Sequence, residues 1–337
     1  MLGHRIVESL GQTWPPFVLV AGLLLIGAVA ADEGLFEAAG ARIARTRLPA
    51  LPLLVVLLAV VACVTAVLNL DTAVVFLTPV LVHAAHRRGL DETPFLYGCV
   101  FMANASSTLL PGSNLTNLLV LDRHPISGAA FAGKMALPWL ASCALTAGFV
   151  ALVLRPRPGR SEHSDPPEFR LGAGLVATAA AVVAVLAFRN PALPVLAVGV
   201  AACALRRLVP RLDVRTPAAL FVLAVALGTL ARYWLGPARL LSSSSRWTTG
   251  LVAAAATVVI NNLPAAVLFS AQRPPHPYAL LLGLDLGPNL AVTGALSAVL
   301  WFQAARTAGV RPSLVRFTVL GVFLVPLTLA ASLALSR

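Results

Sequence analysis

The feature that most constrains the fold is a series of apolar stretches of about 17–25 residues, each long enough to cross a bilayer as a helix. Only 11% of the 337 residues are charged, less than half of the roughly 25% that is usual in soluble domains. The stretches are continuous rather than alternating, which argues against a transmembrane barrel. We therefore expect an all-α polytopic membrane protein with short exposed loops.

Apolar length predicts about eight transmembrane helices, at 15–32, 95–122, 132–154, 171–188, 191–209, 217–236, 277–303 and 312–335. Two further apolar regions, 49–86 and 247–271, are interrupted near their middles by polar residues. Ala28-Val29-Ala30 resembles a signal-peptidase site. We expect the first helix to be retained, because the loop after it carries arginines typical of the cytoplasmic side.

The arginines also predict how the interrupted regions enter the membrane. The region 49–86 is flanked on both sides by basic residues, namely Arg42, Arg45, Arg47, Arg87 and Arg88. Both of its ends are therefore expected on the cytoplasmic side, either as two full spans or as a re-entrant hairpin. The net charge of +12 thus reflects topology. Since no basic stripe with interleaved aromatic residues is present, nucleic-acid binding is not expected.

Two halves with related patterns follow one another along the chain. The polar segment 155–170, "RPRPGRSEHSDPPEFR", is predicted to be a cytoplasmic linker between repeats at 1–154 and 171–337. "LNLDTAVVFLTP" (68–79) aligns with "INNLPAAVLFSA" (260–271), and "MANASSTLLPGSNLTNLLVL" (102–121) corresponds to "LDLGPNLAVTGALSAVLWF" (284–302). In the predicted topology the copies are inverted. Paired interruptions of this kind are the best sequence indication of a transporter's binding site.

Together these four stretches resemble the ion transporter superfamily, which includes arsenite efflux permeases, sodium/proton antiporters and divalent-anion/sodium symporters. "SNLTNLL" and "GPNLAVTGALSAVLW" are most similar to the arsenite branch, and the Ser-Asn-Thr tips typical of the dicarboxylate branch are missing. The resemblance implies re-entrant hairpins at 49–86 and 247–271, interrupted helices at 95–122 and 277–303, alternating access and a homodimer. It also allows a soluble ATPase subunit as a partner. Against this family the chain is about two N-terminal spans short.

Asp71 is the strongest candidate for proton coupling. A charged carboxylate at the centre of a bilayer costs about 3 kcal/mol or more, so it must be paired, protonated or exposed to internal water. The alternative is that Asp71 caps the second helix of the hairpin. Asp285 is a second acid at membrane depth, roughly half a span from a predicted interface and so within reach of surface water.

Amides and hydroxyls complete the predicted substrate and ion site, because they supply both donors and acceptors. Beside Asp71 and at the breaks these are Asn69, Thr72, Ser113, Asn114, Thr116, Asn117, Asn261, Asn262, Asn289, Thr293, Gly294 and Ser297. Their alternative roles are to satisfy loose backbone at the turns or, for the small residues, to pack helices closely.

Other site types find little support. The four cysteines are scattered through apolar runs, so we expect buried thiols and no metal site. We expect no enzyme, because only two acids lie at depth, and no cofactor beyond a coupling H⁺ or Na⁺. The leading prediction is a secondary transporter of the inner or plasma membrane that exports an arsenite-like oxyanion or its neutral acid in exchange for protons. A sodium/proton antiporter, a sodium-coupled di- or tricarboxylate symporter and a shortened, non-transporting paralogue are the alternatives.

Overall fold

The structure is a computed structural model that describes residues 2–121, 126–159, 172–188, 190–210, 215–231, 233–234 and 236–336. The regular elements within these ranges are helices, so the predicted all-α class is confirmed. Of the predicted linker 155–170, residues 160–170 lie outside the described part.

The first half contains seven α-helices in the described residues. They are α1 (Leu2–Asp32), α2 (Leu35–Ala44), α3 (Ala50–Val67), α4 (Leu70–Arg87), α5 (Thr93–Ser106), α6 (Leu115–Leu121) and α7 (Gly128–Phe149). A 3₁₀ turn, Pro111–Ser113, separates α5 from α6, and a π-helical turn, Val150–Leu154, extends α7.

The second half contains nine α-helices in the described residues. Its helices are α8 (Ala173–Ala187), α9 (Ala192–Arg206), α10 (Arg215–Ala231), α11 (Gly236–Ser242), α12 (Arg246–Ile260), α13 (Asn262–Phe269), α14 (Pro277–Leu286), α15 (Leu296–Thr307) and α16 (Leu314–Leu335). Two 3₁₀ turns, Gly287–Leu290 and Val292–Gly294, separate α14 from α15.

Helix length limits how many of the helices could each cross a bilayer as a single continuous span. Ala50–Val67, Gly128–Leu154 and Leu314–Leu335 are long and apolar enough in the described chain, and the bent pair α1–α2 adds a fourth if it is one span. The other predicted spans are interrupted, as α5–α6 and α14–α15 are, or are apolar helices of 10–17 residues such as α9. The count of about eight spans therefore stays a prediction.

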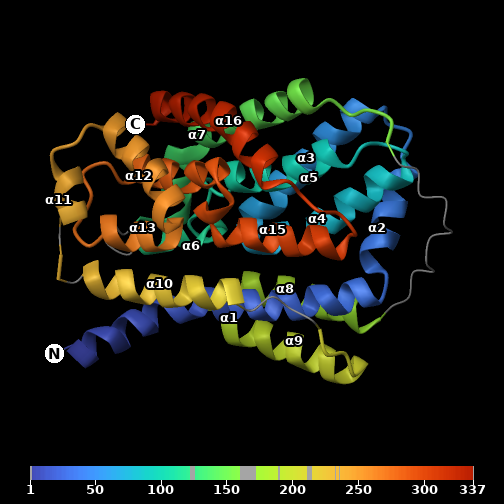
Figure 1. The fold of residues 1–337 in the computed structure, drawn as a ribbon, viewed down its shortest axis with the longest axis horizontal. Helices are drawn as coiled ribbons and strands as arrows, with labels where there is room; N and C mark the ends of the chain where they lie inside the picture. The colour runs from blue at the N-terminus through green and yellow to red at the C-terminus, as the bar shows by residue number, and fades with distance from the viewer. Residues whose placement is uncertain are drawn as a thin grey trace.

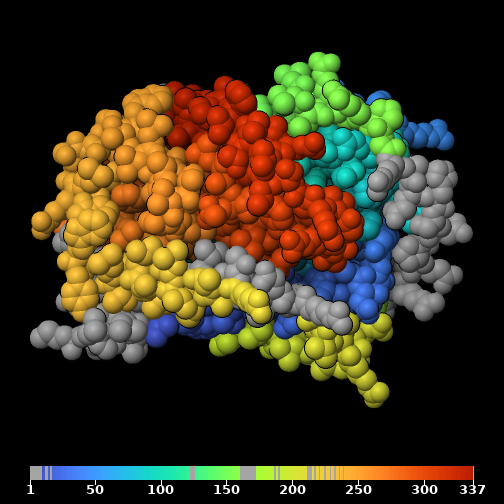
Figure 2. Space-filling model, in the orientation of Figure 1, coloured from blue at the N-terminus to red at the C-terminus, as the bar shows by residue number. Residues whose placement is uncertain are grey.

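The helices form two layers in Figure 1. The lower layer contains α1, α8, α9 and α10, and the upper body contains both interrupted helices and both helix pairs α3–α4 and α12–α13. Within the body α7 packs on α16, and α4 lies along α15. Large apolar side chains of α16, such as Val315 and Phe323, are exposed, as expected for a face in contact with lipid. Figure 2 shows the C-terminal helix, in red, at the surface of the molecule.

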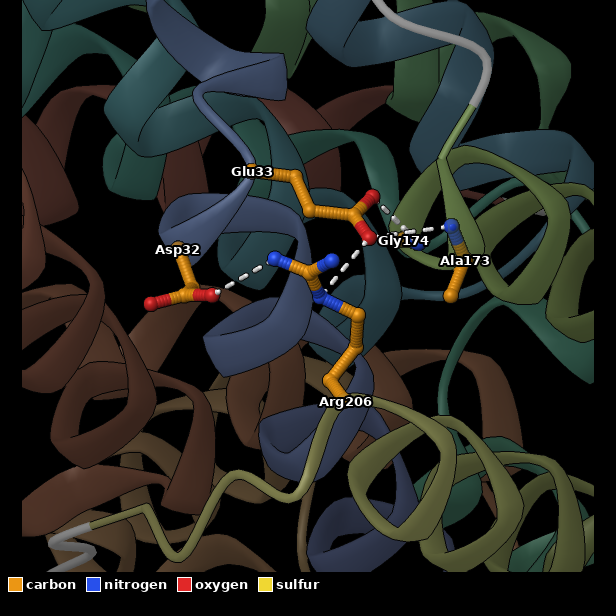
Figure 3. Close-up of polar contacts among 5 residues, drawn as sticks. All are labelled: Asp32, Glu33, Ala173, Gly174 and Arg206. Carbon is orange, nitrogen blue, oxygen red and sulfur yellow. Dashed lines mark hydrogen bonds and ion pairs between the residues drawn. The ribbon is translucent and has the colours of Figure 1, made fainter.

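The lower layer is joined by close backbone packing and by one carboxylate. A Cβ on Gly22 of α1 would lie 2.6 Å from the backbone N of Leu196 in α9, so these helices meet where a side chain has no room. The Glu33 carboxylate accepts hydrogen bonds from the backbone N–H groups of Ala173 (3.0 Å) and Gly174 (2.7 Å) at the start of α8 (Figure 3). An anion is favoured at a helix N-terminus.

Arg206, at the end of α9, completes the same contact. Its Nε lies 3.3 Å from a Glu33 oxygen, and its terminal nitrogen lies 3.5 Å from Asp32 (Figure 3). The end of α1, the start of α8 and the end of α9 therefore meet at one end of the molecule.

The two ends of the α3–α4 pair also meet. The Arg88 guanidinium donates to the backbone oxygens of Thr46 (2.6 Å) and Leu48 (2.7 Å), which precede α3. The region 49–86 is thus a helical hairpin. Its depth in the membrane, and so the choice between two spans and a re-entrant loop, stays a prediction. At the opposite end Arg246, which begins α12, donates to the oxygen of Ser336 after α16 (2.8 Å).

One local prediction is wrong. The segment after α1, expected to be a loop, is helical over Leu35–Ala44, and this helix, α2, leaves α1 at 68°. Arg42 lies in α2, whereas Arg45 and Arg47 follow it outside the helix. Gly34 makes the bend with φ of 69°, a left-handed conformation that glycine adopts without a Cβ penalty. Apolar Phe36 buries against Phe76 of α4, with ring centroids 6.4 Å apart. The contact with α4 therefore stabilises a helix where a loop was expected.

Candidate functional site

The first helix break is held by its own side chains. After α5 ends, the Ser113 hydroxyl donates to the backbone oxygens of Ser107 (2.5 Å) and Leu110 (2.6 Å). The Asn117 amide donates to the same Ser107 oxygen at 2.9 Å. Ser113 and Asn117 therefore satisfy carbonyls that the missing helical turn leaves free. The Asn117 side-chain oxygen itself is buried without a partner.

The second break is tightly packed. A Cβ on Gly294 would lie 2.6 Å from the Cα of Pro288, and one on Gly287 would lie 2.6 Å from the Cα of Ala254 in α12. Gly294 was predicted as a site residue. Its observed environment gives it a packing role, in which the two 3₁₀ turns fold onto each other.

Asp285 connects the two breaks. Its Oδ1 accepts hydrogen bonds from the Asn114 amide (2.9 Å) and the Thr116 hydroxyl (2.8 Å), both at the start of α6. Its Oδ2 is buried without a partner. Sequence spacing placed Asp285 within reach of surface water, whereas the folded chain buries it completely. The distance along the chain misses this, because the opposite half covers the residue.

A second contact between the halves mirrors the first. The Asn104 amide in α5 donates to the Asn289 side-chain oxygen at 2.7 Å, and the Ser297 hydroxyl in α15 donates to the Asn104 oxygen at 3.5 Å. Asn104 precedes the start of α6 by as many residues as Asp285 precedes the start of α15. Thr116 and Ser297 are likewise the second residues of those helices. The sequence interpretation missed Asn104, whose only signal was an amide within an apolar run.

The tip of the first hairpin bears on the two roles considered for Asp71, proton coupling and capping of α4. The Asn69 side chain is the cap of α4 and accepts a hydrogen bond from the Thr72 N–H at 2.8 Å. Asp71, in the first turn, is 8% exposed and accepts no hydrogen bond from another described residue. The capping role therefore belongs to Asn69. Asp71 and the Thr72 hydroxyl, which is buried without a partner, are left for other contacts.

The tip of the second hairpin is strained. Asn261 has φ of 72° and ψ of 153°, a region almost restricted to glycine that costs about 1–3 kcal/mol for other residues. Its side chain accepts from the Leu263 N–H (3.3 Å) and donates to the backbone oxygen of Thr293 (2.9 Å) in the second break. The Thr293 hydroxyl donates to the Val258 oxygen (3.1 Å). Asn262, beside the strained residue, has a buried oxygen without a partner.

Four of the predicted site residues thus carry a buried polar atom that is not hydrogen-bonded, and they are Thr72, Asn117, Asn262 and Asp285. Such groups cost about 1–3 kcal/mol each unless a ligand, ion or water satisfies them. Direct contacts join Asp285 to the first break and Asn261 to the second, but none joins Asp71 to either. Within the described ranges no three His, Cys, Asp or Glu side chains are placed to hold a metal ion.

Helix breaks and buried polar groups in an apolar helical body define a membrane transporter, not an enzyme. The chain belongs to the citrate transporter (CitMHS) family, whose model matches residues 5–284. An uncharacterized transporter of Mycobacterium tuberculosis is 26% identical over 96% of this chain and 85% of its own length, in strain CDC 1551 and in strain H37Rv alike.

The fold is also similar to a solved structure, the YdaH transporter of Alcanivorax borkumensis. The TM-score is 0.51 over 98% of this chain and 86% of the other, at 13% sequence identity. This likeness concerns the fold alone. The broader prediction of a membrane-embedded permease is confirmed, and the arsenite branch of the predicted superfamily is not.

Proposed function

We propose that the chain is a secondary active transporter of a small oxyacid, embedded in the cell membrane and coupled to protons. The observation that carries this proposal is the environment of Asp285. A buried carboxylate with one oxygen bound by two neutral donors and the other oxygen free is suited to take up and release a proton or a cation. Asp71 is the second proposed coupling group, because nothing in the described chain neutralises it.

The mirrored contacts support alternating access. Thr116 reaches Asp285 in the other half, and Ser297 reaches Asn104 in return. Reciprocal contacts of this kind are typical of two units related by a two-fold axis, and inverted repeats are the usual basis of alternating access in secondary transporters. In this proposal the two hairpin tips and the two breaks surround one site near the middle of the membrane.

The chemistry of the site favours a solute without net charge. Its described contacts come from amides, hydroxyls, backbone groups and Asp285, and no lysine or arginine contributes. A bare, multiply charged anion would lie against carboxylates without a compensating cation, which is costly in a buried site. We therefore propose transport of a neutral acid, or of an oxyanion accompanied by its coupling cation.

Two solutes test the substrate class. Arsenite follows from the motif resemblance, and citrate follows from the name of the family. Purified protein in proteoliposomes should accumulate one of them under an imposed pH gradient, and addition of the solute should move protons measurably. The control experiment replaces the pH gradient with a gradient of Na⁺. Uptake driven only by Na⁺ would replace proton coupling with sodium coupling, and movement of neither solute under either gradient would overturn the proposal.

A further inference from the structure

A cavity of about 290 Å³ lies away from the residues of the proposed site, between the lower layer and the upper body. It is formed by α1, α2, α4 and α15, and its lining includes Leu24, Phe36, Val75, Pro79, Ala304 and Arg306. Its volume is close to the lower end of the range of about 300–1,000 Å³ that is typical of small-molecule pockets.

The cavity follows the face of α4 that carries Asp71. Val75 and Pro79 both line it and are one helical turn apart. Asp71 precedes Val75 by the same interval, so the three side chains share one stripe of the helix. The next turn along this stripe therefore carries a carboxylate that has no partner within the described residues.

Among the described residues that line the cavity, Arg306 is the one with a charged side chain. Arg306, in the last turn of α15, lines the cavity and is exposed, and no described carboxylate lies within ion-pair distance of it. On the facing helix α2, Glu37 lies 3.7 Å from the His83 ring of α4. At the end of α1, Asp32 and Glu33 are occupied by Arg206. A lone cation at the mouth of a low-dielectric cleft raises the local concentration of anions.

We propose that this cavity is an entry vestibule for small anions and that Arg306 is its specificity-determining residue. From Val75 and Pro79, which line the cavity, the same stripe of α4 leads to Asp71. The inference rests on the proposed function, because it assigns a route to the same site. An oxyanion drawn in by Arg306 would meet Asp71 only at the inner end, where protonation removes the repulsion.

Thiol labelling tests the vestibule without any transport measurement. Val75→Cys is placed in a Cys63→Ser background, because Cys63 is an exposed native thiol. Labelling rates are compared for two membrane-impermeant reagents of similar size, sulfonatoethyl (anionic) and trimethylammonioethyl (cationic) methanethiosulfonate. We expect modification from one side of the membrane only, with the anionic reagent faster. Arg306→Gln should lower the ratio of anionic to cationic rates about three- to tenfold, as removal of one unit charge at close range predicts.

Matched variants isolate the charge of Arg306. Arg316→Gln removes a charge that contacts Thr93 and does not line the cavity, and should leave the ratio unchanged. A fully exposed site, Val209→Cys, should react with both reagents whatever residue 306 is. If Val75→Cys misfolds, Ala304→Cys probes the same cavity from α15.

Three results would overturn the inference. They are an unreactive thiol at both lining positions, equal rates for the two reagents, or a rate ratio that does not respond to Arg306→Gln. If neither arsenite nor citrate is transported but the charge preference in labelling is intact, the proposed function is contradicted and the vestibule is still supported.

Discussion

The two helix breaks make corresponding contacts with the opposite half, but the chemistry of these contacts differs. In one, the Ser297 hydroxyl meets the amide Asn104, whose nitrogen in turn donates to Asn289. In the other, the Thr116 hydroxyl meets the acid Asp285, which keeps one oxygen free. The neutral position is satisfied within the protein and the acidic one is not. The difference teaches that corresponding positions of the two breaks can differ in whether they carry an ionisable group.

At the hairpin tips the acid is in the first half of the chain, whereas at the breaks it is in the second half. Asn69 caps α4 from an extended conformation, with φ of −175°, and the acid Asp71 follows it. Asn261 caps α13 from a strained conformation, and no acid accompanies it. Each half therefore contributes one buried carboxylate, at the tip in the first half and at the break in the second.

The largest expected effect is that of Asp285→Asn, which makes the second break resemble the first. The amide oxygen preserves the bonds from Asn114 and Thr116, so the fold should survive, but the titratable group is gone. We expect proton-coupled uptake in proteoliposomes to fall to background with little change in thermal midpoint. Thr116→Ser, which retains the hydroxyl, should keep its uptake. Normal coupling in Asp285→Asn would remove this residue from the mechanism.

Asp71→Asn comes next. The substitution breaks no described hydrogen bond, and a charged carboxylate at depth costs about 3 kcal/mol, so the thermal midpoint should stay the same or rise. Proton movement should be lost, while exchange of labelled for unlabelled solute across the membrane continues. Asp71→Glu serves as the control that keeps the charge. Should proton-coupled uptake by Asp71→Asn equal that of the parent, the proton-carrier role is excluded.

The two capping asparagines sharpen the comparison through stability. Asn69→Ala loses a helix cap, worth about 1 kcal/mol. Asn261→Ala loses a cap, loses the bond to Thr293 and keeps a conformation that costs about 1–3 kcal/mol. Thermal unfolding in detergent should therefore show the larger loss at 261, partly recovered by Asn261→Gly. Equal losses of stability in Asn69→Ala and Asn261→Ala would show that the backbone of residue 261 is not strained in the folded protein.

The smallest effects are expected where the hairpins begin or end. Arg88→Gln removes two bonds that close the α3–α4 hairpin, and Arg246→Gln removes one bond between α12 and the end of α16. Each should cost about 1 kcal/mol or less per bond, with the first variant the less stable. Arg45→Gln, with no side-chain bond among the described contacts, is the control. A larger loss in Arg246→Gln would reverse the comparison.

Much of this arrangement could be predicted from local sequence. Pro111 with Gly112, and Gly287 with Pro288, disfavour a regular helix where they stand together in an apolar run, so both breaks and their amides could be predicted. The limits of the apolar runs likewise predicted α7 and α16 closely. Asn104 could not be predicted in the same way, because its partners lie in the other half of the chain and no nearby residue signals them.

The roles of individual polar residues were harder to predict than their positions. Either Asn69 or Asp71 could have capped α4 by composition, and the side-chain geometry that decides between them follows from the turn. The segment after α1 was expected to be a loop, but residues 35–44 form the helix α2. Its apolar face binds α4, and this tertiary contact is not visible in a local window.

The backbone contact between α1 and α9 has a mechanical consequence. A Cβ on Gly199 would lie 2.7 Å from the backbone oxygen of Gly22, so α1 and α9 are in backbone contact here, with no room for a side chain between them. The seam between α1 and the α4–α15 pair, by contrast, holds an open volume. The two sides of α1 therefore differ in packing, with close backbone contact on the side of α9 and a cavity on the side of α4 and α15. If α1 moves during a transport cycle, we therefore expect α9 to move with it and the volume between α1 and the α4–α15 pair to change.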